Sequence, residues 1–82
     1  MRAYVLIEAK VGMAGNISRT LRALPAADAR VLSVDVVTGP FDVIALVETE
    51  DIDELGRTVS ESIQTIDGVA RTNTCLVIHI WE

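Results

Sequence analysis

Hydrophobic residues recur along this chain with two different spacings, which together predict four strands and two helices. Runs rich in β-branched and aromatic residues predict strands. These runs cover residues 3–9, 31–37, 42–48 and 69–81. Apolar residues three or four positions apart predict helices that bury one stripe. The two stripes are Met13, Ile17, Leu21 and Leu24, and Ile52, Leu55, Val59 and Ile63.

Residues that begin or end regular structure separate these segments. Pro25 ends the first predicted helix, because proline cannot continue a helix. Gly39 and Pro40 end the second strand. Asp51 is a candidate N-cap for the second helix, and Glu54, three residues later, suits a capping box.

The resulting order, β-α-β-β-α-β, predicts an α+β fold of the ferredoxin-like type over a single domain, residues 1–82. Right-handed crossovers would put both helices on one face of a four-stranded antiparallel sheet.

The other face of the predicted sheet is also apolar. In the first strand Val5 and Ile7 oppose Tyr4 and Leu6, and in the third Val43, Ala45 and Val47 oppose Ile44 and Leu46, so helices can cover only one of two apolar faces. A sheet with one face in water should alternate apolar and polar residues. We therefore expect this face to be buried by sheet-on-sheet packing in a two-fold dimer, a dimeric αβ-sandwich.

Composition supports association and argues against several classes of function. Half of the 82 residues are hydrophobic, which is more apolar material than a small monomer can bury. The net charge of −5 and the scattered basic residues argue against direct nucleic-acid binding. The single cysteine, Cys75, excludes an intramolecular disulfide and fits a reducing cytoplasm. The sequence shows no signal peptide and no apolar run long enough for a membrane span.

Two glycine-containing motifs carry a resemblance to a known family. The first is valine-x-glycine-x-aromatic-aspartate at residues 37–42, and the second is glycine-valine-x-arginine-threonine-x-threonine at residues 68–74. With the predicted order of elements, they make the chain resemble the effector-binding domain of the Lrp/AsnC transcription regulators. The resemblance covers nearly the whole chain.

The resemblance implies a regulatory protein rather than an enzyme, in a stand-alone form without the helix-turn-helix domain. It implies a homodimer that assembles into an octamer or decamer. Amino acids or related small metabolites would bind where dimers meet, and no cofactor or metal is expected. Full-length regulators of the family are possible partners, and binding would modulate transcription through them.

The expected ligand site centres on the first motif. Gly39 allows a positive φ and exposed turn amides that could bind a carboxylate. Asp42 suits an ammonium group, and Phe41 offers an apolar wall. The predicted ligand-binding residues are Gly39, Pro40, Phe41, Asp42, Thr72 and Thr74.

Purely structural interpretations remain open for the same residues. Gly39 and Pro40 could form only a hairpin turn, with Asp42 bonded to backbone. Thr72 and Thr74 could simply be good strand residues.

Other residues with chemical potential have a structural interpretation that we favour. Arg71 is expected to pair with an acidic neighbour across the sheet. His79 is expected at an interface or a sheet edge, Trp81 is expected at an interface, and Cys75 is expected to be a buried small hydrophobe. The acidic run 48–54 is expected to be a solvated helix start rather than a metal site.

Two further functions compete with ligand sensing. The alternative function is a cofactor-independent monooxygenase of the dimeric ferredoxin-like barrel type, with Asn16, Asn73, His79 and Trp81 as candidates. We favour a non-enzymatic role, because acid–base catalysis needs positioned partner groups. The chain could also be a structural partner that mixes with full-length family members.

Overall fold

A computed structural model describes residues 1–26 and 29–80 and confirms the predicted β-α-β-β-α-β order. The second helix, α2, is followed directly by a π-helical segment, η1, which the sequence pattern did not predict. The elements are β1 Arg2–Ala9, α1 Ala14–Arg22, β2 Ala29–Val36, β3 Val43–Thr49, α2 Ile52–Arg57, η1 Thr58–Ile63 and β4 Val69–Leu76.

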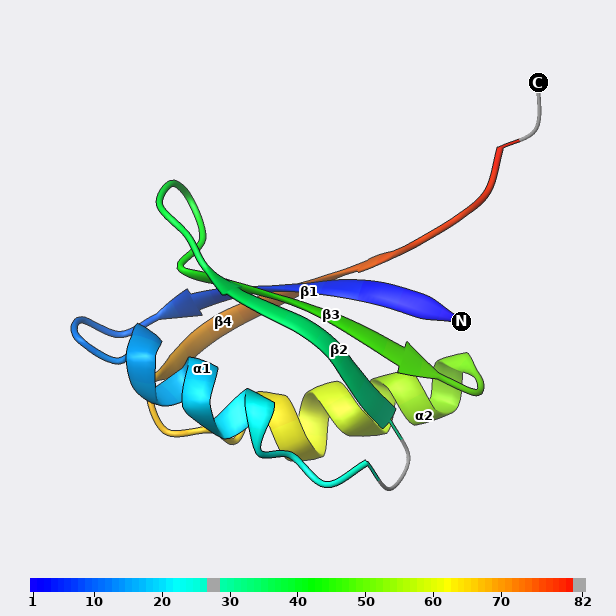
Figure 1. Ribbon diagram of the computed structural model, residues 1–82, viewed down its shortest axis with the longest axis horizontal. Coiled ribbons are helices and arrows are strands. Elements are labelled where there is room, and N and C mark those ends of the chain that lie inside the picture. Colours follow the sequence, from blue (N-terminus) through cyan, green and yellow to red (C-terminus); the bar gives the residue numbers. More distant parts are fainter. Residues whose placement is uncertain (27–28, 81–82) are drawn as a thin grey trace.

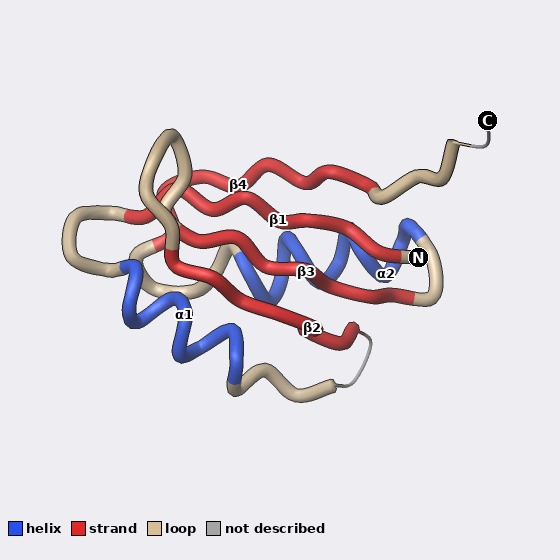
Figure 2. Tube along the Cα trace, turned by 45° about the horizontal axis from the view of Figure 1, so that its top comes forward, coloured by secondary structure: helices blue, strands red, loops and turns tan. Residues whose placement is uncertain are grey.

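The four strands form one antiparallel sheet in the order β2-β3-β1-β4, which leaves β2 and β4 at its edges. Both helices pack against the same face of the sheet, below it in Figure 1. Figure 2 shows the strands side by side, with α2 passing behind them and α1 below β2. The predicted ferredoxin-like arrangement is therefore confirmed.

The hydrophobic core lies between the sheet and the helices. Alternate residues of the two central strands point into it, because successive side chains of a strand face opposite sides. The fully buried core side chains are Ala3, Val5, Ile7, Ile17, Leu21, Val43, Ala45, Val47 and Ile63. The helical stripes predicted from the sequence supply Ile17, Leu21 and Ile63 to this set.

The start of α2 has the N-cap that the sequence predicted. The Asp51 Oδ1 atom accepts a hydrogen bond from the Glu54 amide at 2.9 Å. The Glu54 carboxylate reaches back to the amide of Glu50, also at 2.9 Å. These carboxylates of the acidic run therefore fix the beginning of a helix, as expected.

The last strand is shorter than predicted. β4 ends at Leu76, whereas the apolar pattern continues to residue 81. The reason is that the neighbouring strand, β1, begins at Arg2, so the sheet offers no pairing partner beyond that level. The Val77 amide still donates to the Arg2 carbonyl at 2.9 Å. Trp81 lies outside the described residues.

Candidate functional site

The open face of the sheet has an apolar centre between charged ends. Leu6, Ile44 and Leu46 are half-buried there, and Tyr4 is 44% exposed. The face is free of helices in the protomer (Figure 2). Cys75 lies on this face opposite Tyr4 and is exposed, so the expectation that it is buried is wrong for the single chain.

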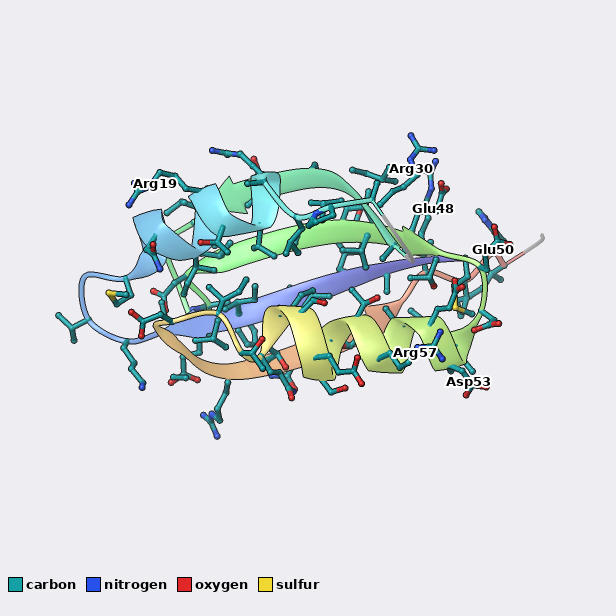
Figure 3. All side chains as sticks on the ribbon, turned by 90° about the horizontal axis from the view of Figure 1, so that it is seen from below. Arg19, Arg30, Glu48, Glu50, Asp53 and Arg57 are labelled. Carbon is teal, nitrogen blue, oxygen red and sulfur yellow. The ribbon has the colours of Figure 1, made fainter. Side chains whose placement is uncertain are left out.

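Ion pairs occupy the two ends of this face. At one end, Glu48 contacts Arg2 at 3.2 Å and Arg30 at 3.5 Å. Figure 3 shows Arg30 and Glu48 together at this end of the sheet. At the other end, Arg71 contacts Glu8 on the neighbouring strand at 3.1 Å, which confirms its predicted role as a cross-sheet ion-pair partner.

The first motif forms the connection between β2 and β3. Gly39 has a φ of +125°, a backbone conformation that residues with a Cβ rarely adopt. The Val37 amide donates to the Asp42 carbonyl at 2.8 Å and closes the loop at its base. The loop rises on the side of the sheet opposite the helices (Figure 1).

Asp42 ties this loop to the end of β1. Its Oδ2 atom accepts a hydrogen bond from the Ala9 amide at 2.8 Å, and its own amide donates to the Ile7 carbonyl at 2.9 Å. The carboxylate therefore has a structural role, because it accepts a hydrogen bond from a backbone amide. That amide belongs to β1, whereas the structural interpretation of the sequence expected a bond within the turn. The residue remains half-buried at the surface.

A hollow of about 350 Å³ lies beside Asp42. Its lining also includes Lys10 and residues that begin α1, Ala14 and Gly15. The N-cap residue Met13 makes no side-chain cap, and the first turn of α1 carries no acidic residue. Because first-turn amides lack acceptors within their own helix, this end of α1 favours an anion. The hollow thus combines one carboxylate with one cation and a helix amino end.

Sequence reasoning missed Lys10 and the start of α1 as parts of this hollow. The local signal was a lysine two residues before Gly12, at the end of a strand and just ahead of a helix. That signal is weak, because only the tertiary contact between Asp42 and Ala9 brings the β2–β3 loop to this corner.

Thr72 and Thr74 lie elsewhere in the protomer. They sit on β4 with their side chains on the helix-facing side, opposite Ile7 and Val5 of β1. The Thr72 hydroxyl accepts a hydrogen bond from Gln64 at 3.0 Å. Thr74 lines a groove of about 390 Å³ with Leu55 and other residues of α2 and η1. The structure therefore separates these threonines from Asp42 within one chain.

Of the candidates for an enzyme, the structure describes Asn16, Asn73 and His79, which lie on different parts of the chain. The Asn16 side chain donates to the Asp67 carbonyl at 3.1 Å. Asn73 is exposed on the open face of β4, and His79 is exposed beyond the end of that strand. Among the described residues, no group of three histidine, cysteine or acidic side chains could hold a metal ion. No described helix has the length and apolar character needed to cross a membrane.

The model of the Lrp/AsnC ligand-binding domain matches residues 2–81 of this chain. The chain belongs to that family. This agrees with the resemblance carried by the two glycine motifs and the order of elements.

The proteins similar to this chain include transcription regulators and proteins of the same fold whose structures have been solved. An uncharacterized HTH-type transcriptional regulator of Pyrococcus abyssi is 33% identical over 66 residues, which are 80% of this chain and 44% of that protein. The chain therefore spans about half the length of the curated relatives it matches. The crystal structure of TTHA0845 from Thermus thermophilus is 33% identical with a TM-score of 0.85, covering 99% of this chain and 96% of that one.

A more distant structure shares the fold alone. The transcriptional regulator NMB0573 of Neisseria meningitidis, solved as a complex with L-Met, is 19% identical with a TM-score of 0.82. The match covers 95% of this chain and 49% of that chain.

Proposed function

We propose that this chain is an amino-acid-binding regulatory module that acts through the assembly of its own copies. The observation that carries the proposal is the hollow beside Asp42, in which a carboxylate, Lys10 and the amino end of α1 come together in a ligand-binding domain family. The L-Met complex of the Neisseria regulator supports the choice of an amino acid as ligand.

The charges of the hollow match those of a zwitterion. The ammonium group of an amino acid would lie against the Asp42 carboxylate, one oxygen of which already accepts from the Ala9 amide. The carboxylate of the ligand would lie toward Lys10 and the first turn of α1. Apolar contact with the ligand side chain would come from Val11 and Ala14, which line the hollow, whereas Phe41 on the Asp42 loop lies outside that lining.

Thr72 and Thr74 could contact the same ligand only if another subunit brings them to it. They line or adjoin a groove on the helix side of β4, away from Asp42 in the same chain. We propose that they meet the ligand where dimers come together, so that each binding site takes groups from neighbouring subunits. Ligand affinity would then depend on the octamer or decamer that the family resemblance implies.

The register of the sheet supports a two-fold dimer through the open face. β1 and β3 are the central strands, with Arg2 opposite Glu48, Tyr4 opposite Leu46 and Leu6 opposite Ile44. A two-fold axis that runs between β1 and β3 and parallel to them would lay β1 of one subunit over β3 of the other.

This packing is complementary in both charge and polarity. Arg2 would face Glu48 of the partner subunit, and the apolar pairs would stack at the centre. An apolar core within a charged rim is the usual composition of such interfaces.

The module would act on transcription through other proteins. The net charge is −5 and the chain carries no cluster of basic residues, so direct contact with DNA is unfavourable. We propose that full-length family regulators supply that contact in the cytoplasm, either in mixed assemblies or by competition for ligand. A purely structural partner role would use the same open face without ligand.

The test is calorimetry with each of the twenty amino acids, combined with light scattering after size exclusion. We expect one amino acid to bind and to change the mass of the assembly. The variant Asp42→Asn should keep the hydrogen bond from the Ala9 amide but weaken binding at least tenfold, because it removes the charge that faces the ammonium.

A matched control, Glu50→Gln, removes an exposed negative charge at the opposite end of the sheet and should bind normally (Figure 3). Absence of binding across all twenty amino acids would reject the sensing function. Normal binding by Asp42→Asn would reject the site while leaving the function in place.

A further inference from the structure

A second cavity of the protomer shares no residue with the hollow beside Asp42. It measures about 160 Å³ and lies between the segment that follows α1, the beginning of β2 and the junction of α2 with η1. Leu24, Pro25 and Val31 supply its apolar wall. An apolar cavity of about 150 Å³ can take a molecule the size of benzene, so this one has room for a small organic ligand. We name it the Thr58 cavity, after the buried residue in its lining.

Thr58 brings a polar group without a protein partner into this wall. The residue is 8% exposed, and its hydroxyl takes part in none of the hydrogen bonds among the described residues. Within the same residues, no fully enclosed side-chain polar atom lacks a partner. The Thr58 hydroxyl is therefore in contact with accessible space, and the cavity that Thr58 lines provides that space. A hydroxyl in this position takes its partner from inside the cavity, either water or a polar group of a ligand.

The π-helical segment η1 explains why several polar residues face the same cavity. The Gln64 amide donates to the Val59 carbonyl, five residues back, at 2.8 Å. This spacing brings residues four and five positions apart onto one side of the helix, and such turns are frequent at functional sites. The polar residues that line the Thr58 cavity follow that spacing: Arg57, Thr58, Glu61 and Ser62.

Two of these residues carry charges that no ion pair of the described residues uses. Arg57 and Glu61 are both exposed, and neither belongs to one of the three ion pairs. The guanidinium of Arg57 offers parallel donors that suit a carboxylate, and the Thr58 hydroxyl offers a further donor. Glu61 would repel a second negative charge. The lining therefore favours a molecule with one carboxylate and an apolar body.

We propose that the Thr58 cavity binds a small aliphatic monocarboxylate. The apolar body of the ligand lies against Leu24, Pro25 and Val31. Its carboxylate accepts hydrogen bonds from the Thr58 hydroxyl and the Arg57 guanidinium. Because all of these residues belong to one protomer, the site is independent of the amino-acid site and of assembly. The module thereby has a second chemical input.

Nuclear magnetic resonance of the full chain tests the site, with 3-methylbutanoate as the probe. We expect saturable shifts of the backbone amides of Leu24, Val31 and Thr58, with half-saturation below about 10 mM. The uncharged 3-methylbutan-1-ol, which has the same carbon skeleton, should bind about tenfold more weakly. Equal affinity for the alcohol would overturn the assignment of an anion. Shifts centred on Lys10 and Gly12 would overturn the cavity as the binding site.

The variant Thr58→Val separates a ligand-binding hydroxyl from a structural one. It removes the hydroxyl at nearly constant shape, so it should weaken binding of 3-methylbutanoate about tenfold. Without ligand, its free energy of unfolding should be unchanged or higher, because the hydroxyl has no protein partner to lose.

Thr65→Val is the matched control. Its hydroxyl donates to the Glu61 carbonyl, and the residue is not part of the cavity lining, so this variant should bind the probe normally. A Thr58→Val protein that is less stable but binds the probe with unchanged affinity would assign the hydroxyl to the fold and reject the site.

Discussion

At the scale of single residues, two glycines of this chain differ in what surrounds them. Gly68 has a φ of +99°, and a Cβ added to it would lie 2.4 Å from the Met13 Cβ atom. Gly68 therefore allows the β4 connection to approach the start of α1, beside the hollow that carries the proposed ligand site. Gly56, in α2, has neither constraint, since an added Cβ would meet nothing within 4 Å.

The substitutions Gly68→Ala and Gly56→Ala should therefore have opposite effects on stability. Gly68→Ala should lower the free energy of unfolding by about 1–3 kcal/mol, from positive φ and overlap with Met13. Gly56→Ala should raise it by about 0.5–1 kcal/mol, because alanine favours the helix. Urea denaturation of both variants measures the two changes. Equal free energies of unfolding for the two variants would contradict the different surroundings of these glycines in the fold.

Also at the residue scale, Asp42 has a structural role and a proposed ligand-binding role, which one variant can separate. Its hydrogen bond with Ala9 holds the loop, and its charge is available to a ligand. The comparison of Asp42→Asn with the parent protein separates these functions, because asparagine retains the acceptor oxygen.

At the scale of elements, the helices differ in how they begin. α2 has a carboxylate cap from Asp51, whereas α1 begins at Met13 without a side-chain cap. An uncapped amino end has unsatisfied amides that can bind an anion. The uncapped helix is the one that lines the hollow beside Asp42, which is why we assign the ligand carboxylate to the amino end of α1 and not to that of α2.

The cap of α2 gives a prediction at this scale. Asp51→Ala should lower the free energy of unfolding by about 1 kcal/mol, because the Glu54 amide loses its acceptor. Asp53→Ala removes a nearby acidic side chain that takes no part in the described cap, and it should lower the free energy of unfolding by less. Thermal unfolding of the two variants measures the difference. A larger loss for Asp53→Ala would contradict the assigned cap.

At the scale of the whole molecule, the sheet has one face covered by helices and one face left open. The open face carries apolar side chains that the chain cannot bury by itself. For 82 residues, the covered face supplies a small core, so burial of the second face would add substantially to stability. Assembly and folding would then be linked, and ligand binding between dimers would act on the same equilibrium.

The open face gives the prediction that belongs to this scale. Leu46→Glu should convert the proposed dimer to a monomer that is still folded, because the buried face against the helices is unchanged. Ile52→Glu introduces the same charge on the helix side, at a residue that is 58% exposed, and should leave the dimer intact. Light scattering measures the mass, and circular dichroism checks the fold. A dimeric Leu46→Glu protein would exclude this face as the interface.

The pattern of the sequence was sufficient for the fold. The helical stripe of Ile17 and Leu21 and the alternation of Val43, Ala45 and Val47 correspond directly to buried positions. Asp51 could be identified as a cap from its spacing to Glu54 alone. These features are local, because periodicity and capping depend on residues within a few positions of each other.

The candidate site could be predicted only in part. The sequence identified Gly39 and Asp42 as a turn with chemical potential. It could not show that Asp42 bonds to Ala9, that Lys10 lies beside it, or that Thr72 lies on another side of the protein. Those facts depend on contacts between residues more than thirty positions apart, for example the 33 positions from Ala9 to Asp42.

The sequence by itself therefore determined the four strands, the two helical stretches, their order and the presence of two apolar sheet faces, because each follows from the spacing of neighbouring residues. The tertiary structure decided which residues share a hollow and where the last strand ends. β4 ends at Leu76, although its apolar pattern continues, because a strand needs a neighbouring strand to satisfy its backbone hydrogen bonds.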